Sequence, residues 1–352
     1  MENKSSGLNI ELGNASSKVA FEHAKSTYHL RENRRGAIGQ QTDGSFSNII
    51  HFGNERIGIA SDGVGTKMEL AERTGIYHTM GYDLVAMVAD DLVTAGFEPS
   101  NITNVIDVNL IDQEIINQMM TGLAQACTFA GMAITGGEIA ELGDRVGGYG
   151  LNMHINWSAT AIGFLSEKRK LITGANIQTG DVVIALKSRG FRSNGFSLIR
   201  KIMEQEFGDL WHTQAYDDQT TWGEKLLTPS LIYTPLINRL LDMELPISGI
   251  AHITGGGIQD NFQRALKASG KGAVLDSLFE PLEVMKRIQQ LGQVSDEDAY
   301  TYWNMGNGML LTVPPDFVDK ILSTAQTLDY QALAAGKITD SGTVQLKLVP
   351  PV

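Results

Sequence analysis

The chain has 352 residues, of which 42% are hydrophobic and 19% are charged, a composition typical of a water-soluble globular protein. This length favours two domains over one hydrophobic core. The formal net charge of −12 argues against nucleic acid or an anionic membrane surface as the main partner.

The sequence also lacks the usual signals for membrane insertion, secretion and disulfide formation. It contains no apolar run near the roughly 18 residues that a membrane span needs. Residues 1–6 are polar and contain no apolar core of a signal peptide. Cys127 is the single cysteine, so an intrachain disulfide is excluded. Together these features predict a cytoplasmic protein with no membrane partner.

The first informative stretch joins a predicted strand to a glycine-containing turn. Residues 57–60 alternate isoleucine with small side chains, which predicts a short buried strand. Residues 61–67 read Ser-Asp-Gly-Val-Gly-Thr-Lys. Their glycines let the backbone approach a phosphate, Lys67 could offset its charge, and Asp62 could bind it through Mg²⁺. Asp62 and Gly63 alone would indicate only a turn, but the whole run is more specific. It differs from the P-loop in glycine spacing and in placing the acid first.

Residues 83–95 carry apolar side chains at helical spacing, and this pattern predicts a helix. Asp91 falls on the apolar stripe of that helix rather than opposite it. A carboxylate in such a place costs free energy unless it meets a cation, a metal or good hydrogen-bond donors. Asp91 is therefore a candidate site residue.

The next helix is predicted to begin after Asp112 as N-cap and to end at Gly131, with Cys127 packed inside it. A strand over 132–135 then leads to Gly-Gly-Glu at 136–138. This repeats the earlier arrangement, in which a strand delivers an acid beside glycines. Residues 159–164 are expected to form the closing strand of the first domain.

The second domain is expected to begin after a connecting segment at 166–181, with a strand over 181–186. Ser193 or Asn194 is expected to cap the following helix, whose first amides would form an anion site. Thr228 and Pro229 are expected to open another helix.

The second strong motif is His-Ile-Thr-Gly-Gly-Gly at 252–257, between a predicted strand and a predicted helix over 258–266. A strand, a glycine turn and a helix form a phosphate-binding arrangement, because free amides at the helix start point at the ligand. His252 alone would more often be a packed core residue, but its place beside Thr254 and the glycines makes a functional role equally favoured. A helix led by Pro314 and a strand over 343–349 are expected to complete the chain.

These motifs, in this order, resemble the phosphoribosylformylglycinamidine cyclo-ligase (aminoimidazole ribonucleotide synthetase) family over about residues 7–348. The similar segments are Asp-Gly-Val-Gly-Thr-Lys at 62–67, Gly-Gly-Glu-Ile-Ala-Glu at 136–141 and His-Ile-Thr-Gly-Gly-Gly at 252–257. The resemblance implies an α/β (α+β) fold of two domains, which we expect at 1–168 and 169–352. It also implies a homodimer in which the N-terminal domains contribute to a shared barrel.

The resemblance further implies ATP-dependent ring closure of formylglycinamidine ribonucleotide to aminoimidazole ribonucleotide, with Mg²⁺ as the metal and a small phosphorylated substrate. It implies catalytic roles for His252, Lys67 and Asp62, and metal binding by Asp62, Asp91 and Glu138. The residues expected to hold nucleotide or phosphate are Gly44, Ser61, Gly63, Gly65, Thr66, Asn194, Thr254, Gly255, Gly256 and Gly257.

Five positions depart from the family pattern. Ser45 and Ser47 replace glycines of a nucleotide lid, Arg192 replaces a histidine, and Asn104 and Val105 lie in a segment that differs throughout. Two alternatives therefore stay open. One is a paralogue that activates or phosphorylates another small substrate, and the other is a catalytically idle homologue. The retained acids, Lys67 and His252 argue against the second.

Overall fold

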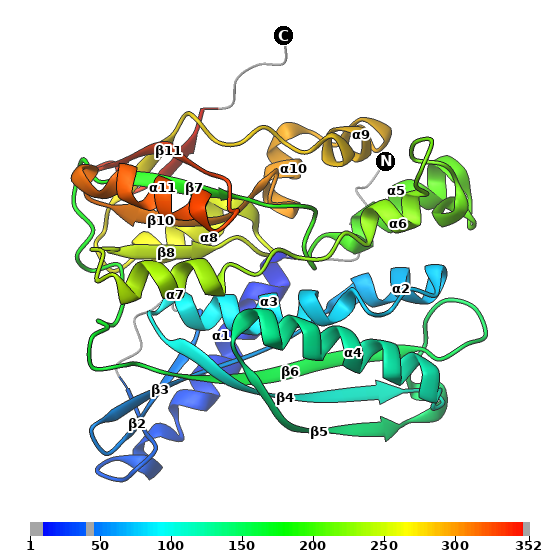
Figure 1. Cartoon of the computed structure of the whole chain (residues 1–352), viewed down its shortest axis with the longest axis horizontal. Coiled ribbons are helices and arrows are strands. Elements are labelled where there is room, and N and C mark those ends of the chain that lie inside the picture. Colours follow the sequence, from blue (N-terminus) through cyan, green and yellow to red (C-terminus); the bar gives the residue numbers. More distant parts are fainter. Residues whose placement is uncertain (1–9, 40–45, 348–352) are drawn as a thin grey trace.

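Two six-stranded mixed sheets, one from each half of the chain, form the framework of the computed structural model, which describes residues 10–39 and 46–347 (Figure 1). The first sheet has the strand order β1 (Ala37–Ile38), β2 (Asn48–Phe52), β3 (Glu55–Gly63), β6 (Ile155–Phe164), β4 (Glu98–Val108) and β5 (Ala133–Glu141). The second has the order β12 (Val344–Leu346), β9 (Gly272–Leu275), β11 (Ala332–Thr339), β7 (Val182–Lys187), β10 (Asn307–Val313) and β8 (Gly249–His252).

The two faces of the first sheet differ in exposure. Along β4 and β6 the side chains alternate between buried and more exposed positions, as expected of a sheet covered on one face. The covered face packs against α2 (Met68–Thr74) and α3 (Met80–Thr94), and α4 (Gln113–Ala130) packs on α3 and β5. The outer face carries half-buried isoleucines and an exposed phenylalanine at one end, namely Ile57, Ile59, Ile162 and Phe164.

The second sheet is covered on both faces, and its strands β7, β10 and the edge strand β8 are almost continuously buried. Helices α7 (Thr234–Asp242) and α11 (Val318–Thr327) pack on one face, and α8 (Gly257–Leu266) packs on the other. Successive residues of β7 alternate between these two cores, because neighbouring side chains of a strand point to opposite faces.

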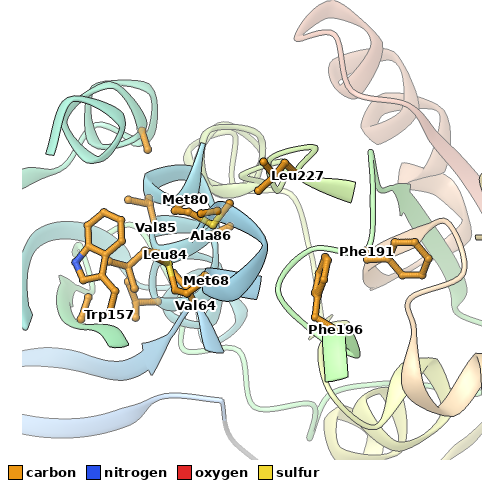
Figure 2. Packing of buried hydrophobic residues seen from close by; sticks show 14 of the residues in the cluster. Val64, Met68, Met80, Leu84, Val85, Ala86, Trp157, Phe191, Phe196 and Leu227 are labelled. Atoms are coloured by element: carbon orange, nitrogen blue, oxygen red, sulfur yellow. The ribbon is translucent and has the colours of Figure 1, made fainter. Parts of the chain in front are cut away.

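The remaining helices are not packed on the central part of either sheet. They are α1 (Ile10–Lys25), α5 (Phe196–Phe207), α6 (Trp222–Leu226), α9 (Glu283–Leu291) and α10 (Asp296–Tyr302), with 3₁₀ turns at Tyr28–Arg31, Gly65–Lys67, Gly143–Arg145, Trp211–Thr213 and Pro315–Phe317. One hydrophobic cluster joins Phe191, Phe196 and Leu227 of the second half to Met80 and Leu84 of α3 (Figure 2). The two halves therefore share a core.

Helix α3 is the element that both halves pack against. It contacts β3 and β6 on one side, and α7 and β8 of the second half on the other (Figure 1). All of its residues are buried except Tyr82 and Asp91, which are half-buried. The predicted helix is therefore present, but it is buried on nearly all sides rather than along one apolar stripe. Asp91 is its one partly accessible acid.

The structure confirms several local predictions. The Asp112 carboxylate accepts hydrogen bonds from the amides of Glu114 and Ile115 at 2.9 and 3.2 Å and caps α4. Gly131 ends this helix in the left-handed conformation, and Cys127 is buried inside it. The two-domain α/β architecture is likewise confirmed.

Two local predictions were wrong. Gly195, not Ser193 or Asn194, is the N-cap of α5, and it has a left-handed backbone with φ of 78°. No helix begins at Thr228; residues 228–233 form no regular secondary structure, and Ser230 and Tyr233 hydrogen-bond acids of α3. The next helix begins one motif later, where a second Thr-Pro pair, Thr234 and Pro235, opens α7. No helix within the described part of the chain is long and apolar enough to cross a membrane.

Candidate active site

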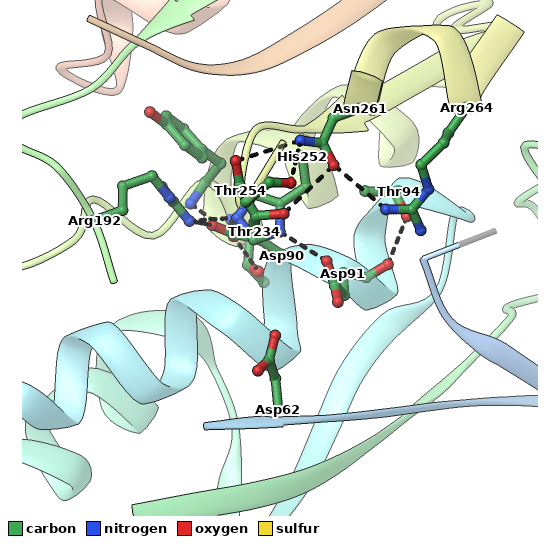
Figure 3. Close-up of polar contacts among 12 residues, drawn as sticks. Asp62, Asp90, Asp91, Thr94, Arg192, Thr234, His252, Thr254, Asn261 and Arg264 are labelled. Atoms are coloured by element: carbon green, nitrogen blue, oxygen red, sulfur yellow. Dashed lines mark hydrogen bonds and ion pairs between the residues drawn. The ribbon is translucent and has the colours of Figure 1, made fainter. Parts of the chain in front are cut away.

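Two carboxylates face each other across the contact between β3 and α3 (Figure 3). Asp62 pairs in register with Ala159 of β6, whose side chain is buried on the helix-covered face, so Asp62 points toward α3. Asp91 is the half-buried acid of α3 that points back toward it. The strand end and the helix together therefore build an acidic pair at the junction of the two halves.

The surroundings of this pair favour protonated carboxylates. Burial raises the pKa of Asp62 to about 6, and the negative charge of Asp91 adds to this, although a hydrogen bond from the Gly63 amide at 2.7 Å opposes it. Burial also raises the pKa of Asp91 to about 7, against the lowering effect of the Arg264 and Arg192 guanidinium groups. A divalent cation between the two acids would stabilise their charged forms.

The donor set fits Mg²⁺ held by two carboxylates. Mg²⁺ is usually bound by one or two carboxylates, with substrate phosphates and waters completing its octahedron. Within residues 10–39 and 46–347, no three His, Cys, Asp or Glu side chains lie together as a metal site. Asp62 and Asp91 would therefore hold the ion only together with oxygens from a ligand.

Glu138 lies apart from this pair. It pairs in register with Val105, which pairs with Ser158, and this row belongs to the exposed outer face of the first sheet. Asp62 belongs to the adjacent row, on the opposite face. The predicted three-acid metal set is thus not brought together within one chain.

His252 ends β8 and is fully buried. Its Nδ1 lies 2.7 Å from Asp91 Oδ1, and its Nε2 lies 2.6 Å from Arg192 Nη2 (Figure 3). An arginine can only donate, so Nε2 must accept and Nδ1 must carry the proton that it donates to Asp91. Burial, reinforced by the Arg192 charge, lowers the pKa of His252 to about 3. The imidazole is therefore neutral and held in one tautomer, with both nitrogens engaged.

Arg192 is placed by an uncommon backbone conformation, with φ of 61°, and its side chain is buried. Besides His252, its guanidinium donates to Asp90 Oδ2 at 3.0 Å and to the Leu231 carbonyl at 2.9 Å. The other oxygen of Asp90 accepts from the Tyr233 and Thr234 amides at 2.9 and 3.0 Å. Asp90 therefore ties α3 to the start of α7 and anchors the arginine.

Lys67, the cation of the first motif, lies in a separate cluster. It is fully buried, and its ammonium donates to Asp83 Oδ2 at 2.8 Å and to the Thr228 carbonyl at 2.9 Å. Asp83 also accepts from the Ser230 amide at 3.1 Å. Burial lowers the pKa of Lys67, against the favourable charge of Asp83. In this arrangement the ammonium joins the two halves and does not face a nucleotide phosphate.

The glycine turn after His252 has the shape expected of an anion site. Gly256 and Gly257 have φ of 92° and 67°, a left-handed conformation that other residues rarely adopt. The Asn261 side chain donates to the Gly257 and Gly255 carbonyls at 2.7 and 3.1 Å and fixes the turn from α8. Asn194 faces Gly255 from the start of α5, since a Cβ built on Gly255 would lie 3.5 Å from Asn194 Oδ1.

The other predicted residues are dispersed around this site. Ser61 lies on the outer sheet face and hydrogen-bonds Thr160 at 2.8 Å. Gly65 has φ of 68°, and Thr66 lies 3.4 Å from the Ser197 hydroxyl of α5. Thr254 is half-buried beside Asn261, with its hydroxyl 3.5 Å from Asn261 Oδ1. Gly44 and Ser45 lie outside the described residues.

Sequence reasoning missed Asp83, Asn261 and Arg264 as parts of the junction. Asn261 and Arg264 are three apart in the predicted helix after the glycine turn, so a shared helix face was a signal available in the sequence. Arg264 also stacks over the Phe46 ring at 4.3 Å, which brings this residue of the predicted lid onto α8. Asp83 gave no comparable signal, because its partners, Lys67 and Ser230, lie 16 and 147 residues away and on other elements.

The assembled groups suit phosphoryl transfer better than acid–base chemistry. The two acids can hold a metal, the glycine turn offers amides to a phosphate, and the histidine orients Asp91 rather than exchanging protons. Each of these groups comes from a different element around α3.

Family models and relatives agree with this architecture. Residues 46–164 match the AIR synthase related protein N-terminal domain, and residues 178–349 match its C-terminal domain. A phosphoribosylformylglycinamidine cyclo-ligase of Picosynechococcus sp. is 34% identical over 98% of this chain and 97% of its own length. One from Methanothermobacter thermautotrophicus is 35% identical over 85% of both. The solved structure of AaThiL complexed with AMPPCP and TMP shares the fold, with a TM-score of 0.62, 14% identity and 94% of each chain covered.

Proposed function

This chain belongs to the AIR synthase related family, and we propose from this premise that it catalyses ATP-dependent cyclisation of formylglycinamidine ribonucleotide to aminoimidazole ribonucleotide, a step of purine biosynthesis. The observation that carries this proposal is the match to cyclo-ligases over nearly the whole chain. The acidic pair and the glycine turn supply the local chemistry that such a reaction needs.

The reaction proceeds through activation of a poor leaving group. The substrate's amide oxygen attacks the γ-phosphorus of ATP, and ADP leaves. An amidine nitrogen of the same substrate then attacks the activated carbon, the C–O bond breaks, and the oxygen leaves as part of inorganic phosphate. The attack is intramolecular, so the protein's main task is to position the groups and stabilise charge.

Asp62 and Asp91 would hold Mg²⁺, which supplies charge neutralisation for the nucleotide phosphates when bound. His252 keeps one oxygen of Asp91 engaged through its Nδ1 proton, which fixes the orientation of that carboxylate. The amides of the turn at Gly255–Gly257 would receive a phosphate, with Asn194 beside them. Lys67 acts indirectly, because it holds α3 against the second half.

We also propose that two copies associate through the outer face of the first sheet. This face presents Ile57, Ile59, Ile162 and Phe164 without a covering layer within the described residues, and Glu138 lies on the same face. A sheet that buries only one face commonly meets a second layer. We also propose a cytoplasmic location.

One observation favours a second candidate function, in which the reaction stops at phosphorylation of a different small substrate. His252 Nε2 accepts a hydrogen bond from Arg192, so this imidazole is not free to accept a proton during ring closure. A phosphoryl transfer that ends with a phosphorylated product would have less need of such a base.

Purified protein incubated with ATP, Mg²⁺ and formylglycinamidine ribonucleotide separates these functions. We expect ADP, inorganic phosphate and aminoimidazole ribonucleotide in equal amounts. A phosphate-release assay measures the phosphate, and mass spectrometry identifies the products. Incubation with a panel of other amides and amidines tests the second function. A phosphorylated product from another substrate, without ring closure, would favour that function. Absence of nucleotide binding would instead indicate an idle homologue.

A further inference from the structure

A cavity of about 590 Å³ adjoins the candidate active site and was not anticipated from the sequence. It lies between the start of α2, the segment after β5 and helix α5. Its walls include Thr66, Arg145, Arg200, Asp107 and Asn156. We name it the rim pocket. Two arginines and three acids, Glu69, Glu72 and Asp107, line it, so its walls are largely polar rather than part of the hydrophobic core.

One wall of the rim pocket is built and fixed by a buried carboxylate. Glu72 of α2 accepts hydrogen bonds from the Tyr149 and Ile155 amides at 2.7 and 2.9 Å. Its Oε2 atom also lies 3.3 Å from His154 Nδ1. The wall also approaches this acid closely, because a Cβ on Gly148 would lie 2.0 Å from Glu72 Oε2. The segment 142–154 is therefore held in a defined shape.

The rim pocket lies along the start of α5, the helix that also follows Asn194 of the candidate site. Asn194 precedes the helix and faces the glycine turn, and Ser197 follows one turn later, 3.4 Å from the Thr66 hydroxyl. Arg200 comes after a further turn and lines the pocket. Ser197 and Arg200 are three apart on α5 and lie on neighbouring turns of one side, so this side of the helix runs from near Asn194 toward the pocket.

The charges of the rim pocket are mixed. Arg145 is exposed on its 3₁₀ turn, and within the described residues its side chain forms no ion pair or hydrogen bond. Arg200 contacts Glu69 and keeps 39% of its side chain exposed. Across from them, Asp107 accepts from Asn156 at 3.2 Å. Two arginines suit a phosphate dianion, and the acids suit ribose hydroxyls or a protonated amidine.

We infer that the rim pocket binds the ribose 5-phosphate portion of a phosphorylated ribosyl amidine, with Arg145 and Arg200 on the phosphate and Asp107 on the hydroxyl or amidine side. This inference rests on the proposed function for the identity of the whole substrate, but the pocket's preference for a phosphorylated sugar can be measured without turnover. It assigns the segment 142–154, through Arg145, a role in selecting the substrate, separate from the metal and nucleotide site.

Titration calorimetry of the full chain with ribose 5-phosphate tests the inference. Wild-type protein is expected to bind it more tightly than it binds ribose or inorganic phosphate. Arg145→Met and Arg200→Met should each weaken binding by on the order of ten-fold, because each removes a charge-assisted contact. Lys201→Met is the matched control, since Lys201 is the exposed neighbour of Arg200 on α5 and does not line the pocket. Both arginines are partly or fully exposed, so these variants should keep the wild-type unfolding midpoint.

Unchanged affinity in both arginine variants, or no binding of ribose 5-phosphate by wild-type protein, would overturn the inference. The cyclisation assay distinguishes this failure from failure of the proposed function. Cyclisation with an unaltered KM in both variants leaves the function intact and removes the pocket from it. Loss of ribose 5-phosphate binding in the variants of a protein that does not cyclise supports the pocket and rejects the function.

Discussion

Helix α3 carries two acidic clusters two turns apart, and they differ in what they leave open. Asp83 and Lys67 are both fully buried, and the described contacts of their charged groups are all with other protein groups. Asp91 is held by His252 through one oxygen but keeps 15% of its side chain exposed, and it faces Asp62. The closed cluster joins the two halves, whereas the open one leaves carboxylate oxygens for a ligand.

The comparison shows that a charged residue within a phosphate-binding motif need not touch phosphate. Lys67 belongs to the glycine-containing run at residues 61–67, yet its ammonium donates to Asp83 and to a backbone carbonyl. Asp91 has no motif of its own beyond its place on an apolar stripe, yet it is the accessible acid. Accessibility, set by the packing of α3, decides which cluster can do chemistry.

Breaking the closed cluster should have the largest effect on stability. Lys67→Met leaves Asp83 buried without its cation, and we expect a loss of about 3–5 kcal/mol in the free energy of unfolding, measured by urea denaturation. The double variant Lys67→Met/Asp83→Asn removes both charges and should recover much of that loss. If the single variant is as stable as wild type, the joint between the halves does not depend on this pair.

Altering the open cluster should reduce activity rather than stability. Asp62→Asn removes one metal ligand, and we expect kcat to fall by on the order of a hundred-fold or more, since a few kcal/mol of charge stabilisation is lost. Its unfolding midpoint at pH 8 should be unchanged or raised, because the wild-type carboxylate is charged there at a cost. Glu138→Gln, on the outer face, is the matched acid substitution and tests separately whether that residue contributes.

The pH dependence of Mg²⁺ binding should also distinguish the clusters. Asp62 and Asp91 have pKa values raised to about 6 and about 7, so the folded protein binds protons more tightly than the unfolded chain. Stability from these groups is therefore highest at low pH and falls as pH rises from about 4 to about 7. Mg²⁺ needs the charged forms, so at a hundred-fold excess over Kd it should add about 2.7 kcal/mol at pH 8 and little at pH 5. Equal stabilisation at both pH values would place the metal elsewhere.

Arg192 contributes both to stability and to the candidate site, because it pairs with buried Asp90 and also fixes the tautomer of His252. In Arg192→Lys one ammonium replaces the planar fork, and we expect a loss of about 1–3 kcal/mol in stability. The nitrogen chemical shifts of His252 should change from a single Nδ1–H tautomer toward a mixture. Arg189→Lys, at an exposed position three residues earlier, is the control. An unchanged His252 spectrum in Arg192→Lys would show that another group sets the tautomer.

The smallest structural change is expected at the glycine turn. Gly255 is exposed and does not have a left-handed backbone, so Gly255→Val should fold normally while its side chain fills the space beside Asn194. Affinity for a nucleotide should fall by on the order of ten-fold, as measured by calorimetry. Gly256 is a less informative position, since φ of 92° would strain any replacement.

The sequence predicted elements well where a local signal specified them. The strand before Asp62, the capped helix after Asp112 and the strand–turn–helix around Gly255–Gly257 are all present. It could not predict partners that lie far apart in the chain, such as Asp83 with Ser230 or Arg192 with Asp90. It also placed a helix at the first of two Thr-Pro pairs, because only tertiary contact with α3 distinguishes them. Opposite sheet faces for Asp62 and Glu138 required the strand register.

The most direct test of the account compares kcat for cyclisation between Asp62→Asn and the double variant Lys67→Met/Asp83→Asn, each normalised to folded protein. The account predicts that Asp62→Asn loses on the order of a hundred-fold or more at saturating Mg²⁺. It predicts that the double variant stays within a few-fold of wild type. The reverse result, with near-normal turnover in Asp62→Asn and a collapse of turnover in a folded double variant, would contradict the assignment of chemistry to the open cluster.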